Sequence, residues 1–222
     1  MRLILMVLMS LTMATPVVAS VYKDFVKVWD ERDRTYRAER EALEPKAQSA
    51  AERALYSLTS ADAAAGEDLI IALNAAWSLS ELVGRGQMLY VFREHMAAKP
   101  SAALSELWMQ GKVDELRRKQ AEADTIESEM QILRGRDTIT AKHWIAAHES
   151  LSMMRGNISG QASELTLINQ NLTTYYRAQS QEVSVGRAVL AAALLGVASS
   201  VRDSQQNTQR RSADCARTGN CR

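Results

Sequence analysis

Apolar residues recur every three or four positions between Leu151 and Tyr175, and this spacing constrains the fold more than any other feature of the chain. One face of an α-helix repeats at that interval, whereas a half-buried strand alternates at every second residue. Only 5% of the residues are aromatic and three are proline, so residues that build strands or break helices are scarce. We therefore predict an all-α fold. The stripe comprises Leu151, Met154, Ile158, Ala162, Leu165, Ile168, Leu172 and Tyr175.

The same period predicts helices earlier in the chain, over residues 20–43, 67–96 and 101–133. Pro45 is expected to end the first helix and begin another that continues to about residue 58, or else to kink a single helix. Ser101 is placed to cap the helix that follows it, because a serine oxygen can accept a hydrogen bond from a free amide of the first turn.

Heptad spacing in the segment 101–133 indicates coiled-coil-like packing. Met109, Leu116, Ala123 and Met130 lie seven residues apart, and a second row ends with Ile126 and Leu133. That second row begins with Lys112 and Lys119, so we expect the far end of this helix to pack more tightly than its beginning.

The last helix is expected to begin after a cap at Asp137 or Thr138 and, with no proline in its way, to reach Arg202. At 1.5 Å per residue it would be a rod roughly 90 to 100 Å long. The sequence therefore predicts one domain over residues 20–202, an elongated antiparallel helical bundle with coiled-coil-like packing and a long C-terminal helix.

Residues 1–19 are typical of a secretory signal peptide. Arg2 supplies the positive start, an apolar run follows from Leu3, and Val17 and Ala19 occupy the small-residue positions of a cleavage site before Ser20. An uncleaved membrane anchor is the alternative, but a spanning helix needs about 20 apolar residues and this run is shorter. We predict a periplasmic or secreted protein.

The balance of charge disfavours a nucleic-acid partner. Removal of residues 1–19 takes away Arg2 and no acidic residue, which leaves 26 basic and 26 acidic side chains. Affinity for nucleic acid comes largely from neutralised phosphates, so a chain without net charge has no overall attraction to it.

Residues 203–222 lack apolar side chains except at the cysteines and a few alanines, and are expected to form a polar flexible tail. Cys215 and Cys221 both lie in this tail. In an oxidising compartment such a pair usually closes a disulfide, which here would be a local clip. A bridge between two chains and free thiols are the alternatives.

No pattern in the chain indicates catalysis, a metal or a cofactor. His143 and His148 lie five residues apart, which places them on different sides of a helix, and His95 is remote in sequence. The segment GNISG at residues 156–160 has its serine at the fourth position, not at the middle position of a nucleophile elbow. We therefore expect a protein that is not an enzyme.

Small residues at Ala192, Gly196 and Ser200 form a ladder that would let another helix approach closely. The ladder overlaps an apolar run over residues 188–198, which is too short to span a membrane. Packing within the protein's own bundle is the favoured interpretation. A surface for self-association or for a protein partner is the second, and membrane contact is the third.

These observations predict an exported assembly, adaptor or structural subunit of a bacterial cell-envelope apparatus. A periplasmic chaperone or inhibitor that clasps a protein client is an alternative, with Trp77, Trp108 and Trp144 as anchors. Tryptophans on helical stripes more often pack in the core.

The layout also resembles that of helical minor pilins of type IV secretion and conjugation systems. It has a signal peptide, a helical bundle, and a long C-terminal helix with glutamine and asparagine, as in INQNLTTYYRAQSQE at residues 168–182. The resemblance implies a subunit that assembles with other proteins in the cell envelope.

Overall fold

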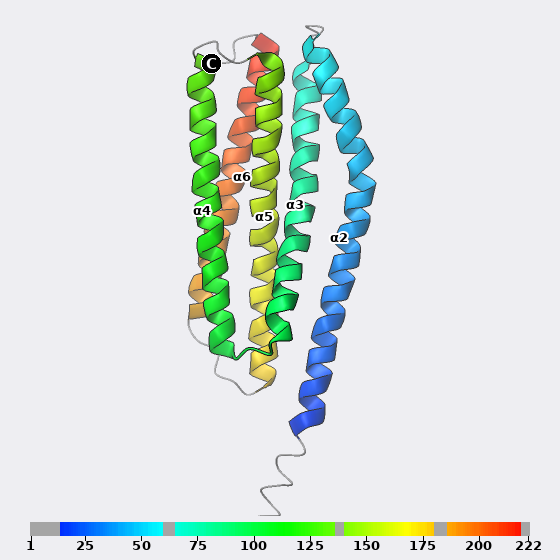
Figure 1. The fold of residues 1–222 in the computed structure, drawn as a ribbon, viewed down its shortest axis with the longest axis vertical. Coiled ribbons are helices and arrows are strands. Elements are labelled where there is room, and N and C mark those ends of the chain that lie inside the picture. The colour runs from blue at the N-terminus through cyan, green and yellow to red at the C-terminus, as the bar shows by residue number, and fades with distance from the viewer. Residues whose placement is uncertain (1–13, 60–64, 136–139, 180–185, 219–222) are drawn as a thin grey trace, which may run out of the picture.

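The computed structural model describes residues 14–59, 65–135, 140–179 and 186–218, and within these ranges the chain is helical without a strand. The predicted all-α bundle is confirmed. Consecutive helices run antiparallel along the long axis of the molecule (Figure 1). The helices are α2 (Ala14–Thr59), α3 (Ala65–Ala97), α4 (Ala102–Gly135), α5 (Ala141–Ala178) and α6 (Gly186–Thr218).

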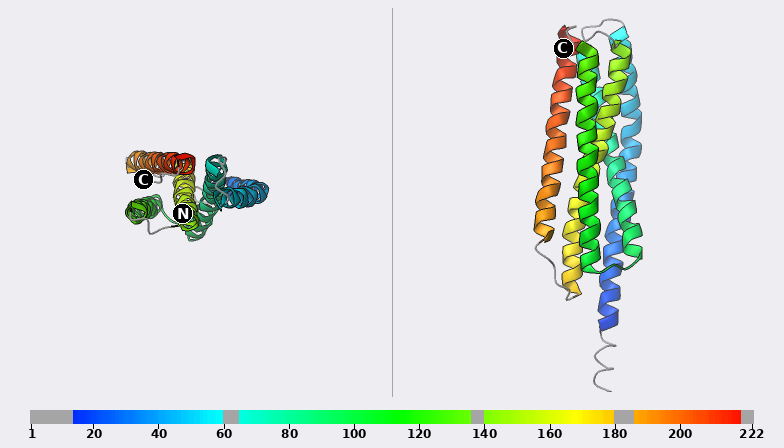
Figure 2. Two further views of the ribbon diagram at one scale, coloured as in Figure 1. Left: turned by 90° about the horizontal axis from the view of Figure 1, so that it is seen from above. Right: turned by 60° about the vertical axis from the view of Figure 1, so that its left-hand side comes forward.

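Helix α5 lies at the centre of the bundle and contacts each of the other four helices. Figure 2 shows α4 and α6 against one side of α5 and α3 against the other, with α2 outermost beside α3. Nearly every side chain of α5 between Arg155 and Leu165 is therefore buried. The position of this helix determines where the rest of the core forms.

Helix α2 continues through Pro45 without ending, so the expected helix boundary is wrong and the alternative of a single helix is correct. Proline leaves the carbonyl group one turn earlier without its usual donor. Pro45 is exposed, so water can satisfy that carbonyl group. The predicted signal peptide lies mainly on residues 1–13, outside the described residues, and its cleavage stays a prediction.

The turn between α3 and α4 bears out the predicted cap at Ser101. The Ser101 side-chain oxygen accepts a hydrogen bond from the backbone amide of Leu104 at 3.3 Å. Just before it, Lys99 adopts a left-handed backbone conformation with φ of 48° and donates its amide to the Met96 carbonyl group. A left-handed residue followed by Pro100 is a usual way to terminate a helix.

The first heptad row of α4 faces the core as expected, because Met109, Leu116, Ala123 and Met130 are all buried. The second row does not, since Ile126 and Leu133 are exposed. The expectation that the far end packs more tightly is also wrong. The beginning of α4 contributes Trp108 to an aromatic cluster with Phe25, Trp29, Phe92, Tyr175 and Tyr176.

The predicted rod over residues 138–202 is wrong, because α5 ends at Ala178 and α6 runs back antiparallel along it (Figure 1). This reversal buries Leu190, Leu194 and Val201, which a rod extending beyond the bundle would leave in water. The cap of α5 is Thr140, whose oxygen accepts a hydrogen bond from the His143 amide. The expected caps Asp137 and Thr138 lie outside the described residues.

The expected flexible tail is wrong over residues 203–218, which form the last four turns of α6. Thr208 and Ser212 are buried against the bundle although they are polar. Cys221 and the side chain of Cys215 lie outside the described residues, so their disulfide stays a prediction.

Candidate functional site

Three glycines bring α3 and α5 into unusually close contact. A Cβ atom added to Gly156 would lie 2.5 Å from the Trp77 carbonyl oxygen. One added to Gly84 or Gly160 would meet the backbone of the facing helix more closely still. No side chain larger than hydrogen fits at these three positions, and we call this contact between α3 and α5 the glycine seam. It explains why the segment GNISG has glycine at both ends. Its glycines serve helix packing and not a nucleophile elbow.

On the side of α5 that faces α4 and α6, Arg155 is buried within an ionic network. Its guanidinium donates to Asp124 and Glu127 on α4, each at 2.9 Å, and to Thr208 on α6 at 2.8 Å. Burial is the largest single influence on the pKa of Glu127 and raises it, but the hydrogen bonds from Arg155 and Thr208 and the charges of Arg155 and Arg211 together hold that pKa below the usual range. Arg155 thus joins three helices and explains why Thr208 is buried.

On its α2-facing side, α5 carries a buried carboxylate, Glu164. Its Oε2 atom accepts hydrogen bonds from Tyr36 at 2.5 Å and from Arg32 at 2.7 Å. Burial and the adjacent carboxylate raise the pKa of Tyr36, so the phenol remains a donor. This contact fastens the outermost helix to the central one.

The three histidines do not come together, and the described residues contain no group of histidine, cysteine and acidic side chains suited to a metal ion. His143 is exposed beside its cap, whereas His148 is fully buried against Trp144. Burial lowers the pKa of His148 to about 4, so its imidazole is neutral at pH 7.

His95 and Ser105 lie together, with 3.1 Å between the imidazole Nε2 and the serine Oγ. Such a pair is the core of many nucleophilic sites. Ser105 is fully buried, however, and its Oγ also lies 2.7 Å from the Tyr176 hydroxyl, which donates to the Pro100 carbonyl group. Ser105 therefore has no exposed surface that a substrate could contact. The chain of hydrogen bonds instead fastens the ends of α3, α4 and α5.

The predicted ladder of Ala192, Gly196 and Ser200 lies on the side of α6 that faces away from α5, and all three residues are exposed. A Cβ atom added to Gly196 would have no neighbour within 4 Å. Ser200 marks the edge beside α4, where its hydroxyl accepts a hydrogen bond from Gln120 at 3.0 Å. The favoured interpretation, packing within the bundle, therefore holds for the apolar run, whose Leu190, Leu194 and Val197 are buried in the core, and not for the ladder.

Two large aliphatic side chains extend the exposed surface around the ladder. Val189 is 66% exposed and Leu195 is 64% exposed. Together with Ala192, Gly196 and Ser200 they form what we call the outer face of α6. The three tryptophans suggested as client anchors do not contribute a comparable surface, because Trp77 and Trp144 are buried and Trp108 packs against the core.

Sequence reasoning missed Arg155 and Glu164, although one of them left a signal. Arg155 lies four residues after Leu151 and three before Ile158, within the apolar stripe itself. A charged residue at such a position is buried with partners or points to the edge of the core. Glu164 lies beside the stripe, and its burial depends on α2, which the pattern of α5 does not reveal.

None of the described helices is long and apolar enough to span a membrane. Comparisons with known proteins found no match to this chain among family models, curated proteins or solved structures.

Proposed function

We propose that this protein is an exported helical subunit that binds another protein through the outer face of α6, as an assembly, adaptor or structural component of a bacterial cell-envelope apparatus. It has no catalytic role in this proposal. The observation that carries it is the exposure of Val189, Leu195 and Gly196 on one side of a helix whose other side is fully packed.

The two sides of α6 differ in a way that supports an intermolecular contact. The inward side already buries Leu190, Leu194 and Val201, so rotation of the helix cannot cover the outer face without exposing them. Exposed apolar side chains grouped on one surface are unfavourable in water and are typical of interaction sites. The glycine lets a second helix approach closely.

A pair of leucine substitutions tests this proposal. Leu195→Asn removes the apolar side chain from the outer face of α6, and Leu107→Asn is its control on α4, where Leu107 is 70% exposed. Neither change should alter the thermal unfolding of dilute protein appreciably, because both residues are exposed. Site-specific photo-crosslinking from position 195 in the native host should give a defined protein adduct, and Leu195→Asn should reduce association, whereas Leu107→Asn should not.

Gly196→Leu provides the steric counterpart, because open space lies above that glycine. The folded protein should tolerate the leucine, but a helix packed against Gly196 would be displaced. Sedimentation of the purified protein separates a second copy from a different partner as the occupant. The proposal is wrong if crosslinks are absent and association is unchanged in both variants. In that case, flotation with liposomes would test membrane contact.

A further inference from the structure

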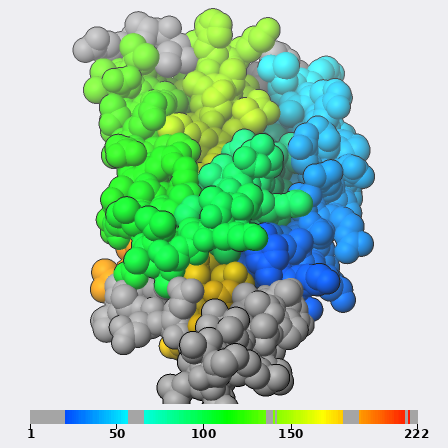
Figure 3. Space-filling view, turned by 60° about the horizontal axis from the view of Figure 1, so that its bottom comes forward, coloured from blue at the N-terminus to red at the C-terminus, as the bar shows by residue number. Residues whose placement is uncertain are grey.

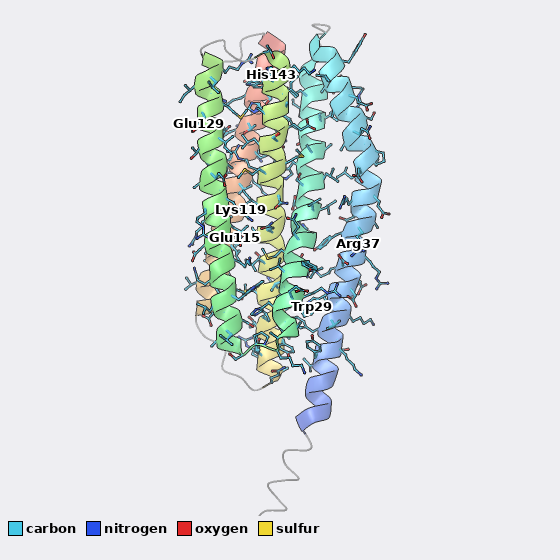
Figure 4. The ribbon with its side chains drawn as sticks, viewed as in Figure 1. Trp29, Arg37, Glu115, Lys119, Glu129 and His143 are labelled. Carbon is cyan, nitrogen blue, oxygen red and sulfur yellow. The ribbon has the colours of Figure 1, made fainter. Side chains whose placement is uncertain are left out.

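A groove of about 620 Å³ crosses the outer surface of α3, between α2 and α4. Its floor includes Val83, Gly86 and Tyr90 of α3. Figure 3 shows α4, α3 and α2 side by side on this face of the molecule. In Figure 4, Arg37 on α2 and Lys119 on α4 lie on opposite sides of α3. We call this feature the α3 groove.

The walls of the α3 groove carry more positive than negative charge. Asp33 pairs with Arg37 at 2.7 Å, and Asp30, just outside the groove, pairs with Arg93 at 3.3 Å. Arg40 on the same wall has no ion pair in the part of the chain that the structure describes. The basic side chains that line the groove are Arg37, Arg40, Arg93, Lys112 and Lys119, and the acidic ones are Asp33 and Glu115.

On the α4 wall, two lysines share one carboxylate. Lys112 and Lys119 each lie 2.8 Å from an oxygen of Glu115. Their hydrogen bonds lower the pKa of Glu115 to about 2, so the carboxylate is ionised at neutral pH and offsets only one of the two ammonium groups. Each wall therefore retains one uncompensated positive charge, although the net charge of the chain after residue 19 is zero.

The floor between these walls is open and mostly apolar, with Gln87 and Gln161 as its polar lining residues. Tyr90 is 64% exposed, and a Cβ atom added to Gly86 would have no neighbour within 4 Å. An amphipathic helix that lies in a groove places its apolar stripe on the floor and its charged flanks against the walls. Here the flanks must be acidic, because Arg40 on one side and Lys119 on the other would repel basic residues.

We propose that the α3 groove binds an acidic amphipathic helix of a partner protein. The apolar stripe of that helix would contact Tyr90 and the space above Gly86, and its carboxylates would pair with Arg40 and with the lysines of α4. This proposal does not depend on the outer face of α6, which uses different residues on a different helix. If both proposals hold, the protein joins two partners.

Two glycine substitutions test the shape of the α3 groove. Gly86→Leu fills the space above its floor, and Gly111→Leu on α4 is the matched control, because an added Cβ has no neighbour at either position. Gly111 does not line the groove. The probe is a fluorescent amphipathic peptide of Leu, Ala and Glu at helical spacing, with binding measured by anisotropy on the full chain. Gly86→Leu should abolish binding, whereas Gly111→Leu should leave it unchanged.

Charge reversal tests the walls with the same probe. Arg40→Glu and Lys119→Glu should each weaken binding by roughly fivefold, while Arg210→Glu, on an exposed part of α6, should have little effect. A peptide with glutamine in place of glutamate should bind weakly. The proposal is overturned if the acidic peptide does not bind, if Gly86→Leu leaves its affinity unchanged, or if only a polyanion such as heparin binds.

Discussion

The glycine seam and the outer face of α6 both use small residues four positions apart, yet one is closed by a second helix and the other is open. Gly156 and Gly160 touch the backbone of α3, whereas Gly196 has open space above it. The aliphatic residues of each helix account for the difference. The buried Leu190, Leu194 and Val201 of α6 lie opposite its ladder, so the ladder faces outward, whereas α5 is covered on all sides between Arg155 and Leu165.

The spacing of small residues therefore shows that a second helix could approach closely. It does not show that a second helix is present. The side on which the large aliphatic residues lie decides whether the approaching helix belongs to the same bundle. For α6, Leu190 and Leu194 already fill the inward side. The contrast predicts that substitutions on α5 change stability and that those on the outer face of α6 change association.

The largest effect is expected at Arg155. Arg155→Leu removes the charge that pairs with Glu127, and this leaves a partly buried carboxylate without its main partner. Removal of one partner from a buried ion pair costs about 3 to 5 kcal/mol in the free energy of unfolding. Urea denaturation at pH 7 measures the loss, and Arg210→Leu on α6 should stay within about 0.5 kcal/mol of the wild type. Equal losses in both variants would contradict the proposed contrast.

The next effect is a loss of stability in acid caused by His148. The pKa of His148 is about 4 in the folded protein, whereas an imidazole in the unfolded chain has the ordinary value of 6.5. Between pH 4 and pH 6.5, therefore, the unfolded chain binds a proton at His148 and the folded protein does not. The free energy of unfolding should therefore fall by about 3 kcal/mol in total as the pH is lowered from 6.5 to 4, and be unaffected above 6.5. Denaturation at several pH values checks this. His148→Leu should remove this part of the acid sensitivity, and its persistence would exclude His148 as the cause.

A smaller loss is expected at the glycine seam. Gly160→Ala places a methyl group against the Glu81 backbone, which cannot move aside as a flexible side chain can. We expect the free energy of unfolding to fall by roughly 1 to 3 kcal/mol, the usual range for overpacking. Thermal denaturation monitored by circular dichroism is the measurement. An unchanged melting temperature would mean that α3 and α5 lie further apart in solution than the contact at Gly160 indicates.

The smallest effect has the opposite sign. Gly196→Ala adds a methyl group in open space and removes the entropic cost of glycine within a helix. Stability should rise by about 0.5 to 1 kcal/mol. The same denaturation experiment measures it, and a decrease would show that the outer face of α6 is covered by its own chain.

Much of the fold could be predicted from the sequence because local signals and burial agree. The first heptad row of α4 and the cap at Ser101 are examples, since each depends on residues within a few turns of one helix. The ladder of Ala192, Gly196 and Ser200 is visible in the sequence, but the direction in which it faces is not. That direction depends on where α4 and α5 lie relative to α6.

The reversal between α5 and α6 and the packing of residues 203–218 could not be predicted for a related reason. No proline or long polar linker marks the reversal, so the helical period alone favours a continuous rod. Thr208 and Ser212 carry no apolar signal. Thr208 can be buried because Arg155, which is distant in sequence, donates a hydrogen bond to it. A pattern of apolar residues does not predict such a polar pair.

The central place of α5 also bears on the order in which the chain can fold during its synthesis. Helix α4 packs mainly on α5 and α6 and meets α3 through Trp108, so most of the core around α4 cannot form until the fourth helix exists. More than half of the chain must therefore be made before its core can close. Until then the apolar face of α4 is uncovered, and exposed apolar surface of this kind makes a partly folded chain prone to aggregation.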